Sequence, residues 1–173
     1  MKTIAGLLFI TLLSINSFAQ LSTDKAFISF YSEMDDITAE NSNVKSEFNM
    51  STGEISFTVS IDKFIFKNST MQKHFNQEGV MNSEKFPKAT FTGKIVENSA
   101  IDYTANGTHK VKVKGKMTIK GISKEIEVNG ELTIDGAKIT ATSKFSLDRF
   151  EYGVDGKKES VSQILAITVK ANY

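Results

Sequence analysis

Side chains that usually carry chemistry are sparse in this chain of 173 residues, which has two histidines and no cysteine. A zinc site needs three or four nitrogen, sulfur or oxygen ligands in register, and neither His74 nor His109 has such neighbours in the sequence. Nucleophilic catalysis needs a hydroxyl or thiol beside a histidine and an orienting carboxylate, whereas the serines and threonines here occupy strand-like positions. The acidic pair Asp35 and Asp36 is better explained by turn formation than by acid–base catalysis. We therefore expect no enzyme, no catalytic residue, no metal site and no cofactor.

One arginine and one histidine are candidate contacts for a polar ligand group. Arg149 shortly precedes an aromatic–glycine pair, and a guanidinium can hold an anionic head group through two parallel hydrogen bonds. An ion pair with a neighbouring acid would explain Arg149 equally well. His74, in a predicted helix, either touches the same head group or simply packs on the helix surface. Both residues stay head-group candidates beside these structural alternatives.

Composition narrows the class of protein. The net charge of +1 is too small for a nucleic-acid binder, which needs a strong basic excess. Lysines at positions 110, 112, 114 and 116 form a row, but we expect glutamates on a paired strand to neutralise them. Thirteen phenylalanines and no tryptophan suit a dry interior, because phenylalanine has no polar tip.

The first residues are typical of an export signal. Lys2 supplies a positive start, residues 4–13 are apolar, and Ser17 and Ala19 fit the small-residue cleavage rule. An apolar stretch of this length is too short to span a bilayer, so we expect no stable membrane insertion. The sequence predicts a signal peptide over residues 1–19, cleaved after Ala19, and one domain over residues 20–173. The mature protein is then periplasmic or secreted.

Alternating apolar residues predict strands with one buried face, and the phase of this alternation changes between runs. A phase change across a short turn keeps both runs facing one interior, as in an antiparallel meander. The pattern places hairpin turns at Thr52-Gly53, at Gly121-Ile122 and at Asp135-Gly136. Counting outward from these turns sets Phe48 opposite Phe57, Lys116 opposite Glu127 and Leu132 opposite Ile139.

Further strands are expected over residues 26–32, 88–96 and 161–173, and a helix over residues 69–78. Ser69 and Gln72 match a capping box for that helix, and Gly79 is a suitable stop. The apolar face of the helix is narrow, so it is predicted to cover an opening. The whole is an all-β chain of about eight strands with one or two short helices. Such strands commonly close into a barrel, with a sandwich as the alternative.

The inward positions define a candidate lining. Large apolar side chains gather there, together with small residues that would leave room in the lumen or balance large neighbours. The predicted lining residues are Phe30, Phe48, Phe57, Phe64, Phe66, Met71, Phe75, Phe86, Phe91, Gly115, Met117 and Phe145.

Three segments resemble the YceI-like family of exported bacterial proteins, also called lipid- or polyisoprenoid-binding proteins. Residues 74–95 contain His74-Phe75 and the run FPKATF, residues 115–124 read GKMTIKGISK, and residues 147–153 read LDRFEYG. Each segment is a weak match alone, but their order and spread over the chain are fairly specific. The resemblance implies an extended lipocalin-like barrel whose apolar tunnel holds a long lipid chain, without catalysis.

Two main functions follow from the sequence. The first is carriage or storage of an isoprenoid-type or fatty-acid-like molecule in the cell envelope. The second is a structural or interaction domain with a filled core that acts through its surface. A lipid hydrolase or isomerase would need a titratable group inside the barrel, where the inward positions offer almost none. A homodimer is an open alternative for either function.

Overall fold

The computed structural model describes residues 20–156 and 159–173. The predicted signal peptide therefore lies outside the described residues. The strands are β1 (Gln20–Ser32), β2 (Ile37–Asn49), β3 (Glu54–Ser60), β4 (Ile65–Phe66), β5 (Lys88–Ile95), β6 (Gly107–Ile119), β7 (Ile122–Asp135), β8 (Lys138–Asp148) and β9 (Ile164–Asn172). The helical elements are α1 (Ser69–Asn76) and the short 3-10 turns η1 (Met34–Asp36), η2 (Ile61–Lys63), η3 (Asn98–Ala100) and η4 (Arg149–Tyr152).

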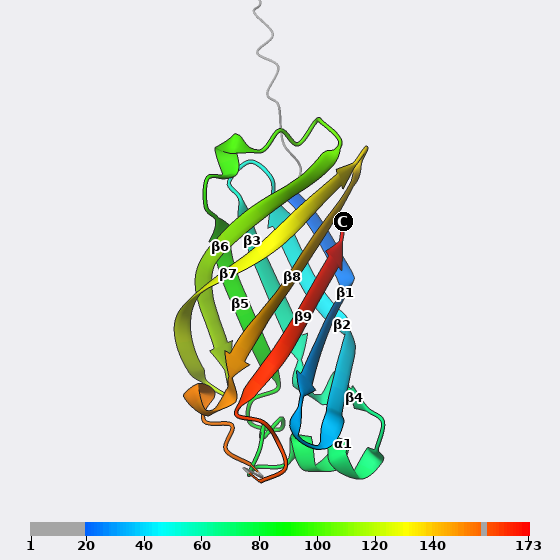
Figure 1. The fold of residues 1–173 in the computed structure, drawn as a ribbon, viewed down its shortest axis with the longest axis vertical. Helices are drawn as coiled ribbons and strands as arrows, with labels where there is room; N and C mark the ends of the chain where they lie inside the picture. The colour runs from blue at the N-terminus through cyan, green and yellow to red at the C-terminus, as the bar shows by residue number, and fades with distance from the viewer. Residues whose placement is uncertain (1–19, 157–158) are drawn as a thin grey trace, which may run out of the picture.

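Eight of these strands close into an antiparallel barrel. The order around the ring is β1-β9-β8-β7-β6-β5-β3-β2, and β2 pairs with β1 to complete it. The two-residue strand β4 pairs with β2 outside the ring. Figure 1 shows α1, β4 and η4 gathered at one end of the elongated barrel. We call this the α1 end, and the end that carries the β2–β3 turn and residues 96–106 the opposite end. The predicted fold class is confirmed.

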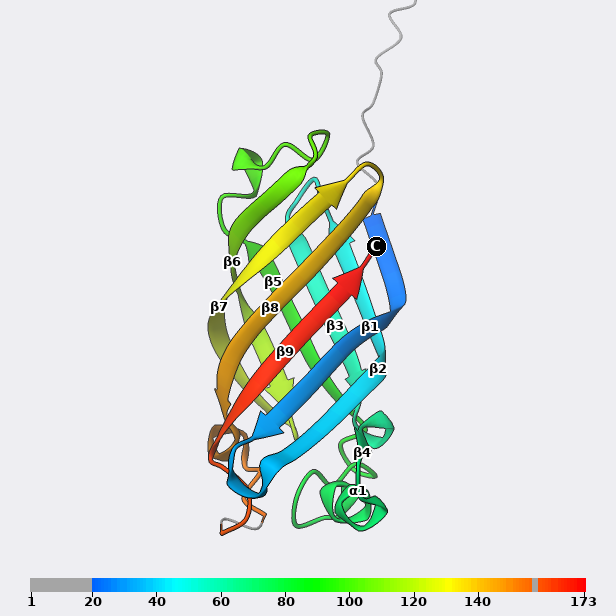
Figure 2. The ribbon, with the colours of Figure 1, turned by 45° about the vertical axis from the view of Figure 1, so that its right-hand side comes forward.

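Inward and outward faces follow the alternation. On β3 the buried side chains are Ile55, Phe57 and Val59, and on β5 Phe91 and Ile95 are buried. Figure 2 shows β9, β1 and β2 running side by side as another part of the wall. The core is therefore the lumen of the barrel, shared by all the strands of the ring.

The predicted cross-strand pairs are wrong by two residues at all three hairpins. Phe48 faces Ile55, Lys116 faces Glu125 and Leu132 faces Ala141. The turns differ from the predicted ones, and the β6–β7 turn is Lys120-Gly121, with φ of 49° and 79°. Positive φ at both central positions is the geometry of a type I′ turn. A two-residue slip leaves every side chain on its predicted face, which is why the core positions remain correct.

The β2–β3 and β7–β8 turns have their own local causes. The Oδ1 atom of Asn49 accepts hydrogen bonds from the backbone N–H groups of Ser51 and Thr52, at 3.0 and 3.1 Å. This lengthens the loop to residues 50–53, between paired Asn49 and Glu54. In the β7–β8 hairpin, Asp135 pairs with Lys138, so the turn is displaced by one residue.

The helix begins where predicted but has a different cap. Asn68 is the N-cap, and its Oδ1 accepts from the N–H of Thr70 at 2.8 Å. The predicted capping box at Ser69 is therefore wrong. The helix ends at Asn76, because Gln77 is already extended, and Gly79 lies beyond it.

Candidate functional site

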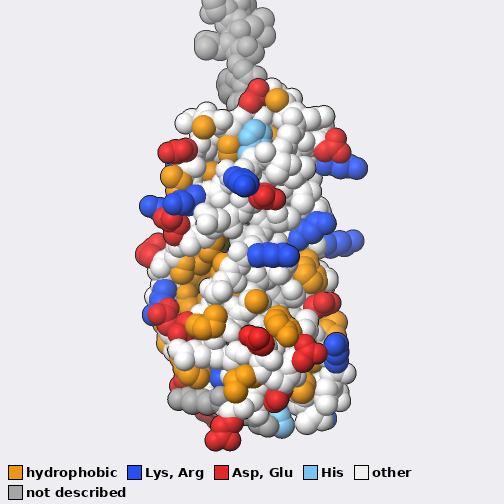
Figure 3. All heavy atoms as spheres, viewed as in Figure 1, with side chains coloured by type: hydrophobic (Ala, Val, Ile, Leu, Met, Phe, Trp, Pro, Cys, Tyr) orange, Lys and Arg blue, Asp and Glu red, His pale blue; other side chains and the backbone are white. Residues whose placement is uncertain are grey.

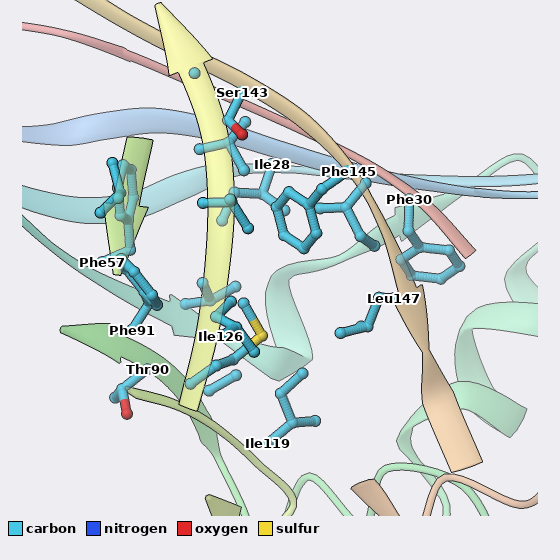
Figure 4. A pocket seen from close by; sticks show the side chains of 18 of the residues that line it. Ile28, Phe30, Phe57, Thr90, Phe91, Ile119, Ile126, Ser143, Phe145 and Leu147 are labelled. Carbon is cyan, nitrogen blue, oxygen red and sulfur yellow. The ribbon is translucent and has the colours of Figure 1, made fainter. Parts of the chain in front are cut away.

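An apolar cavity of about 210 Å³ lies inside the barrel. Side chains from β1, β3, β5, β6, β7, β8 and β9 line it, joined near the α1 end by residues of α1, η2 and η4. Figure 4 shows Phe57 and Phe91 on one side of this space and Phe145 and Leu147 on the other. An engineered apolar cavity of about 150 Å³ stays dry and binds benzene. The site can therefore hold an apolar group without any hydrogen bond.

Most of the predicted aromatic lining is in place. The cavity is lined by Phe30, Phe57, Phe64, Phe75, Phe91, Met117 and Phe145, all named from the sequence, and by Arg149. The remaining candidates, Phe48, Phe66, Met71, Phe86, Gly115 and His74, lie elsewhere in the structure.

Gly115 shows why a small inward residue need not enlarge a lumen. A Cβ atom built on Gly115 would lie 2.4 Å from the Cα of Gly93 on the paired strand and 2.9 Å from Cζ of Phe91. Gly93 and Gly115 are directly opposite each other, so the Phe91 ring packs over both. The predicted lining role of Gly115 is not what the structure shows, since this glycine balances a large neighbour.

Four phenylalanines close the lumen at the α1 end. Phe75 of α1 lies 5.5 Å from Phe64, 5.8 Å from Phe30 and 5.1 Å from Phe66, measured between ring centroids. These spacings are typical of packed aromatic pairs. The helix therefore covers this end with Phe75, as its narrow apolar face predicts, whereas Met71 on the same helix is 38% exposed.

Three aromatic rings close the opposite end. Phe48 is fully buried, and its ring centroid lies 5.9 Å from that of Tyr103 and 5.8 Å from that of Tyr173. The hydroxyl of Tyr173 lies 2.5 Å from Oγ of Ser46, and that of Tyr103 donates to Asn98 at 2.6 Å. Burial raises the pKa of both tyrosines to about 12. Phe48 is therefore part of a closed end.

Arg149 is buried and binds backbone. Its Nε donates to the carbonyl of Ser162 at 2.9 Å, and its Nη2 donates to Val161 at 2.9 Å. Its Nη1 donates to the carbonyls of Val154 and Gly156. Burial lowers the pKa of Arg149, although nearby acids act in the opposite direction. These hydrogen bonds hold the backbone that follows η4. The donors of Arg149 are thus used for backbone carbonyls, and not for the head group or the ion pair expected from the sequence.

Two further candidates, His74 and Phe86, lie outside the cavity lining, whereas Tyr152 is part of it. His74 is half-buried on α1 and is not one of the lining residues. Phe86 lies beside the β6–β7 turn, because a Cβ on Gly121 would be 2.9 Å from its ring. Tyr152, which sequence reasoning missed, lines the cavity and is 1% exposed, and its hydroxyl has no hydrogen-bond partner. Burial raises the pKa of Tyr152.

Much of the wall is aliphatic and was not among the predicted site residues. The alternation along the strands carried the signal, but the prediction selected the phenylalanine and methionine positions. The aliphatic lining includes Ile28, Ile55, Val59, Ile95, Val113, Ile126, Val128, Leu147, Leu165 and Ile167.

Residues 20–156 and 159–173 contain no cluster of three histidine or acidic side chains that could hold a metal ion. Within the same ranges, no helix is both long and apolar enough to cross a membrane.

The ring closure and the continuous apolar lumen define an antiparallel barrel built around an internal cavity. The sequence profile of the YceI-like domain matches residues 20–173, and the chain belongs to this family. A UPF0312 protein from Photorhabdus laumondii is 25% identical over 72% of the chain and 65% of its own length. A second from Yersinia enterocolitica is 27% identical over 52% of the chain and 43% of its own length. The chain thus aligns with less than two thirds of either relative.

Solved structures share the fold at low sequence identity. BcnA of Burkholderia cenocepacia superposes with a TM-score of 0.73 at 18% identity, covering 86% of this chain and 96% of BcnA. A polyisoprenoid binding domain from Saccharophagus degradans, implicated in plant cell wall breakdown, gives 0.76 at 11% identity, covering 90% and 98%. The YCEI protein of Campylobacter jejuni gives 0.59 at 20% identity, covering 99% and 92%.

Proposed function

We propose that this protein binds one long apolar chain, of an isoprenoid-type or other lipid, inside its barrel and carries or stores it without chemical change. The observation that carries the proposal is the apolar cavity, whose lining side chains come from seven strands of the ring. Membership of the YceI-like family supports it. The polyisoprenoid binding domain that shares the fold supports the same ligand class.

Burial of hydrocarbon supplies the binding energy in this proposal. Each methylene group removed from water contributes about 0.8 kcal/mol, before the costs of association are subtracted. A chain that fills the lumen therefore needs no polar contact to bind. The same cavity argues against the filled-core alternative, in which the protein acts only through its surface.

The place of action in this proposal is the cell envelope. The basic start, short apolar stretch and small-residue cleavage site in residues 1–19 support export. N-terminal sequencing of protein from the periplasm or culture medium is expected to begin at Gln20. Full-length protein confined to the cytoplasm would contradict export.

The test of lipid binding is extraction of the protein purified from its own host. We expect organic solvent to release a long apolar molecule, detected by mass spectrometry. A preparation that releases nothing, and that also fails to bind added geranylgeraniol and added fatty acid, would overturn the proposal.

A matched pair of variants places the ligand inside the barrel. Ala141 lines the cavity, whereas Ala166 is exposed on the outer face of β9. Ala141→Phe fills lumen space and is expected to weaken binding by roughly tenfold or more, while Ala166→Phe leaves binding unchanged. Equal binding by both variants would place the ligand outside the lumen.

A further inference from the structure

The barrel wall has one seam that is only half paired. The ladder between β7 and β8 runs from Asp135 and Lys138 to Gly130 and Ser143. Beyond that pair, no ladder joins residues 122–129 to residues 144–148, all of which the structure describes. The Oγ of Ser143 donates to the carbonyl of Asn129 at 2.7 Å and terminates the pairing. We call the gap between these two segments the lateral opening.

The exposure of the inward side chains increases at the point where the β7–β8 ladder ends. On the paired side, the inward residues Leu132, Ile134, Ile139 and Ala141 are all buried, with exposures from 1 to 8%. Along the lateral opening, the inward residues are only half-buried, and all of them line the cavity: Ile126, Val128, Phe145 and Leu147. Figure 3 shows hydrophobic side chains in a hollow of the surface where β7 and β8 separate in Figure 1.

On the closed side of β8, the paired inward residues are more buried than those along the lateral opening. Phe145 pairs with Ile167 and Leu147 pairs with Leu165 on the closed β8–β9 wall. Both β9 residues are buried, at 9% and 8% exposure. The two β8 side chains, whose β7-facing edge has no strand partner, are thus more exposed than their β9 partners.

Two other partly paired seams of the ring are closed by buried residues. Where the β1–β9 ladder stops, Ala26 and Ala171 are fully buried. Where the β2–β3 ladder stops, Ala39 is fully buried and Asn41 donates to the carbonyl of Ser60 at 2.8 Å. The aromatic clusters described above close the two ends of the lumen. The lateral opening is thus a place in the described wall where the lumen meets the surface.

Two side-chain contacts bound the lateral opening at the α1 end. Nζ of Lys120 in the β6–β7 turn donates to the carbonyl of Gly153 at 2.7 Å. Lys124 forms an ion pair with Glu151 at 3.3 Å. These contacts tie the β6–β7 hairpin to η4 and the residue after it. The gap is therefore framed on four sides, by β7, by β8, by the end of the ladder and by this pair of contacts.

We propose that a lipid chain passes into and out of the cavity sideways, through the lateral opening, and that its polar end stays there in water. This rests on the proposed function. A buried polar end would need hydrogen-bond partners, and the lumen offers little. The guanidinium of Arg149 is engaged with backbone carbonyls, and the unpaired hydroxyl of Tyr152 is itself buried, with almost no accessible surface. An edge without a strand partner is also the part of a wall that can move without breaking ladder hydrogen bonds.

Cysteine cross-linking tests the path, because the chain has no cysteine of its own. Glu127 and Ser146 are exposed residues on the two sides of the lateral opening. The double variant Glu127→Cys/Ser146→Cys is bridged with a bis-maleimide that contains a cleavable disulfide. The probe is cis-parinaric acid, whose fluorescence reports binding. We expect bridging to slow association and dissociation by roughly tenfold or more, with a nearly unchanged Kd, and reductant to restore both rates.

The matched control keeps the cysteine at position 146 and bridges it to β9 instead of β7. Ser146 pairs with Ala166 on β9, and both are exposed. In the bridged variant Ser146→Cys/Ala166→Cys, the cross-link joins two strands that are already paired. We expect this variant to bind and release lipid at the same rates as before bridging. Equal rates before and after bridging Glu127→Cys/Ser146→Cys would overturn the lateral path.

A probe with an enlarged polar end tests the same path in the unmodified protein. A fatty acid whose carboxyl end carries a polyethylene glycol tag is expected to bind within about threefold of the untagged acid. Loss of binding on tagging would overturn the proposal, because it would mean that the polar end is enclosed. Failure of both probes to bind at all would instead count against the proposed function itself.

Discussion

Arg149 is the buried charge on which the segment after η4 depends. Its guanidinium donates to four backbone carbonyls in residues 154–162. Lysine keeps the charge but cannot span these acceptors, because it lacks the planar fork of donors. Arg149→Lys is therefore expected to lower the free energy of unfolding by about 3 kcal/mol, measured by chemical denaturation. Wild-type stability of Arg149→Lys would contradict this role.

Two tyrosines give a matched test of buried hydroxyl groups. The hydroxyl of Tyr152 has no partner, whereas that of Tyr173 contacts Ser46. An unpaired buried hydroxyl is unfavourable and a paired one is favourable. Tyr152→Phe is expected to raise the free energy of unfolding by about 1 kcal/mol, and Tyr173→Phe to lower it by a similar amount. The same sign for both substitutions in denaturation experiments would contradict the assignment.

The buried tyrosines also set an alkaline limit. Burial raises the pKa of Tyr103 and Tyr173 from 10.0 to about 12 in the folded protein. Above pH 10 the unfolded chain loses these protons while the folded chain keeps them, so the free energy of unfolding falls as pH rises toward 12. Denaturation at several pH values between about 9 and about 11 measures this slope. Tyr173→Phe should flatten it, and an unchanged slope would exclude Tyr173 as a cause.

At the scale of elements, the β6–β7 turn depends on one glycine in two ways. Gly121 has φ of 79°, and a Cβ there would lie 2.9 Å from the ring of Phe86. Gly136 in the β7–β8 turn also has positive φ, at 59°, but nothing lies within 4 Å of its Cβ position. Both Gly→Ala variants incur backbone strain of about 1 kcal/mol. We expect Gly121→Ala to lower Tm clearly more than Gly136→Ala does. Equal decreases in Tm would show that the Phe86 ring moves aside without a cost in stability.

Strand faces could be predicted from the sequence, whereas register could not. A side chain keeps its face when pairing slips by two residues, so the alternation cannot distinguish the two registers. The deciding interactions are local, such as the hydrogen bonds that Asn49 accepts in the β2–β3 loop. A turn assigned from glycine alone therefore places the hairpin but misses its exact pairs.

The first half of β2 escaped prediction because its core side chains are small or polar. Ala39 and Asn41 are fully buried. The side-chain N–H of Asn41 donates to the carbonyl of Ser60 at 2.8 Å. Such residues give no apolar alternation. The lateral opening was missed for a related reason, since nothing in the pattern of β7 or β8 indicates where their pairing ends.

For the whole molecule, an occupied lumen should stabilise the fold. A ligand that binds only the folded state raises the free energy of unfolding, by about 2.7 kcal/mol at a hundredfold excess over Kd. We expect Tm to rise with added geranylgeraniol after delipidation. Ala141→Phe should show a smaller rise than Ala166→Phe, because its lumen is partly filled. A Tm independent of lipid in all three proteins would contradict internal binding.

Closure of the ring between β1 and β9 constrains the order of events during biosynthesis. Strand β1 has to wait for residues 164–172, which follow the other seven strands of the ring along the chain. Until then β1 and β8 each lack a neighbour, and the nascent polypeptide cannot reach its native topology. If the protein is exported as proposed, this delay keeps it unfolded for passage through a secretion channel.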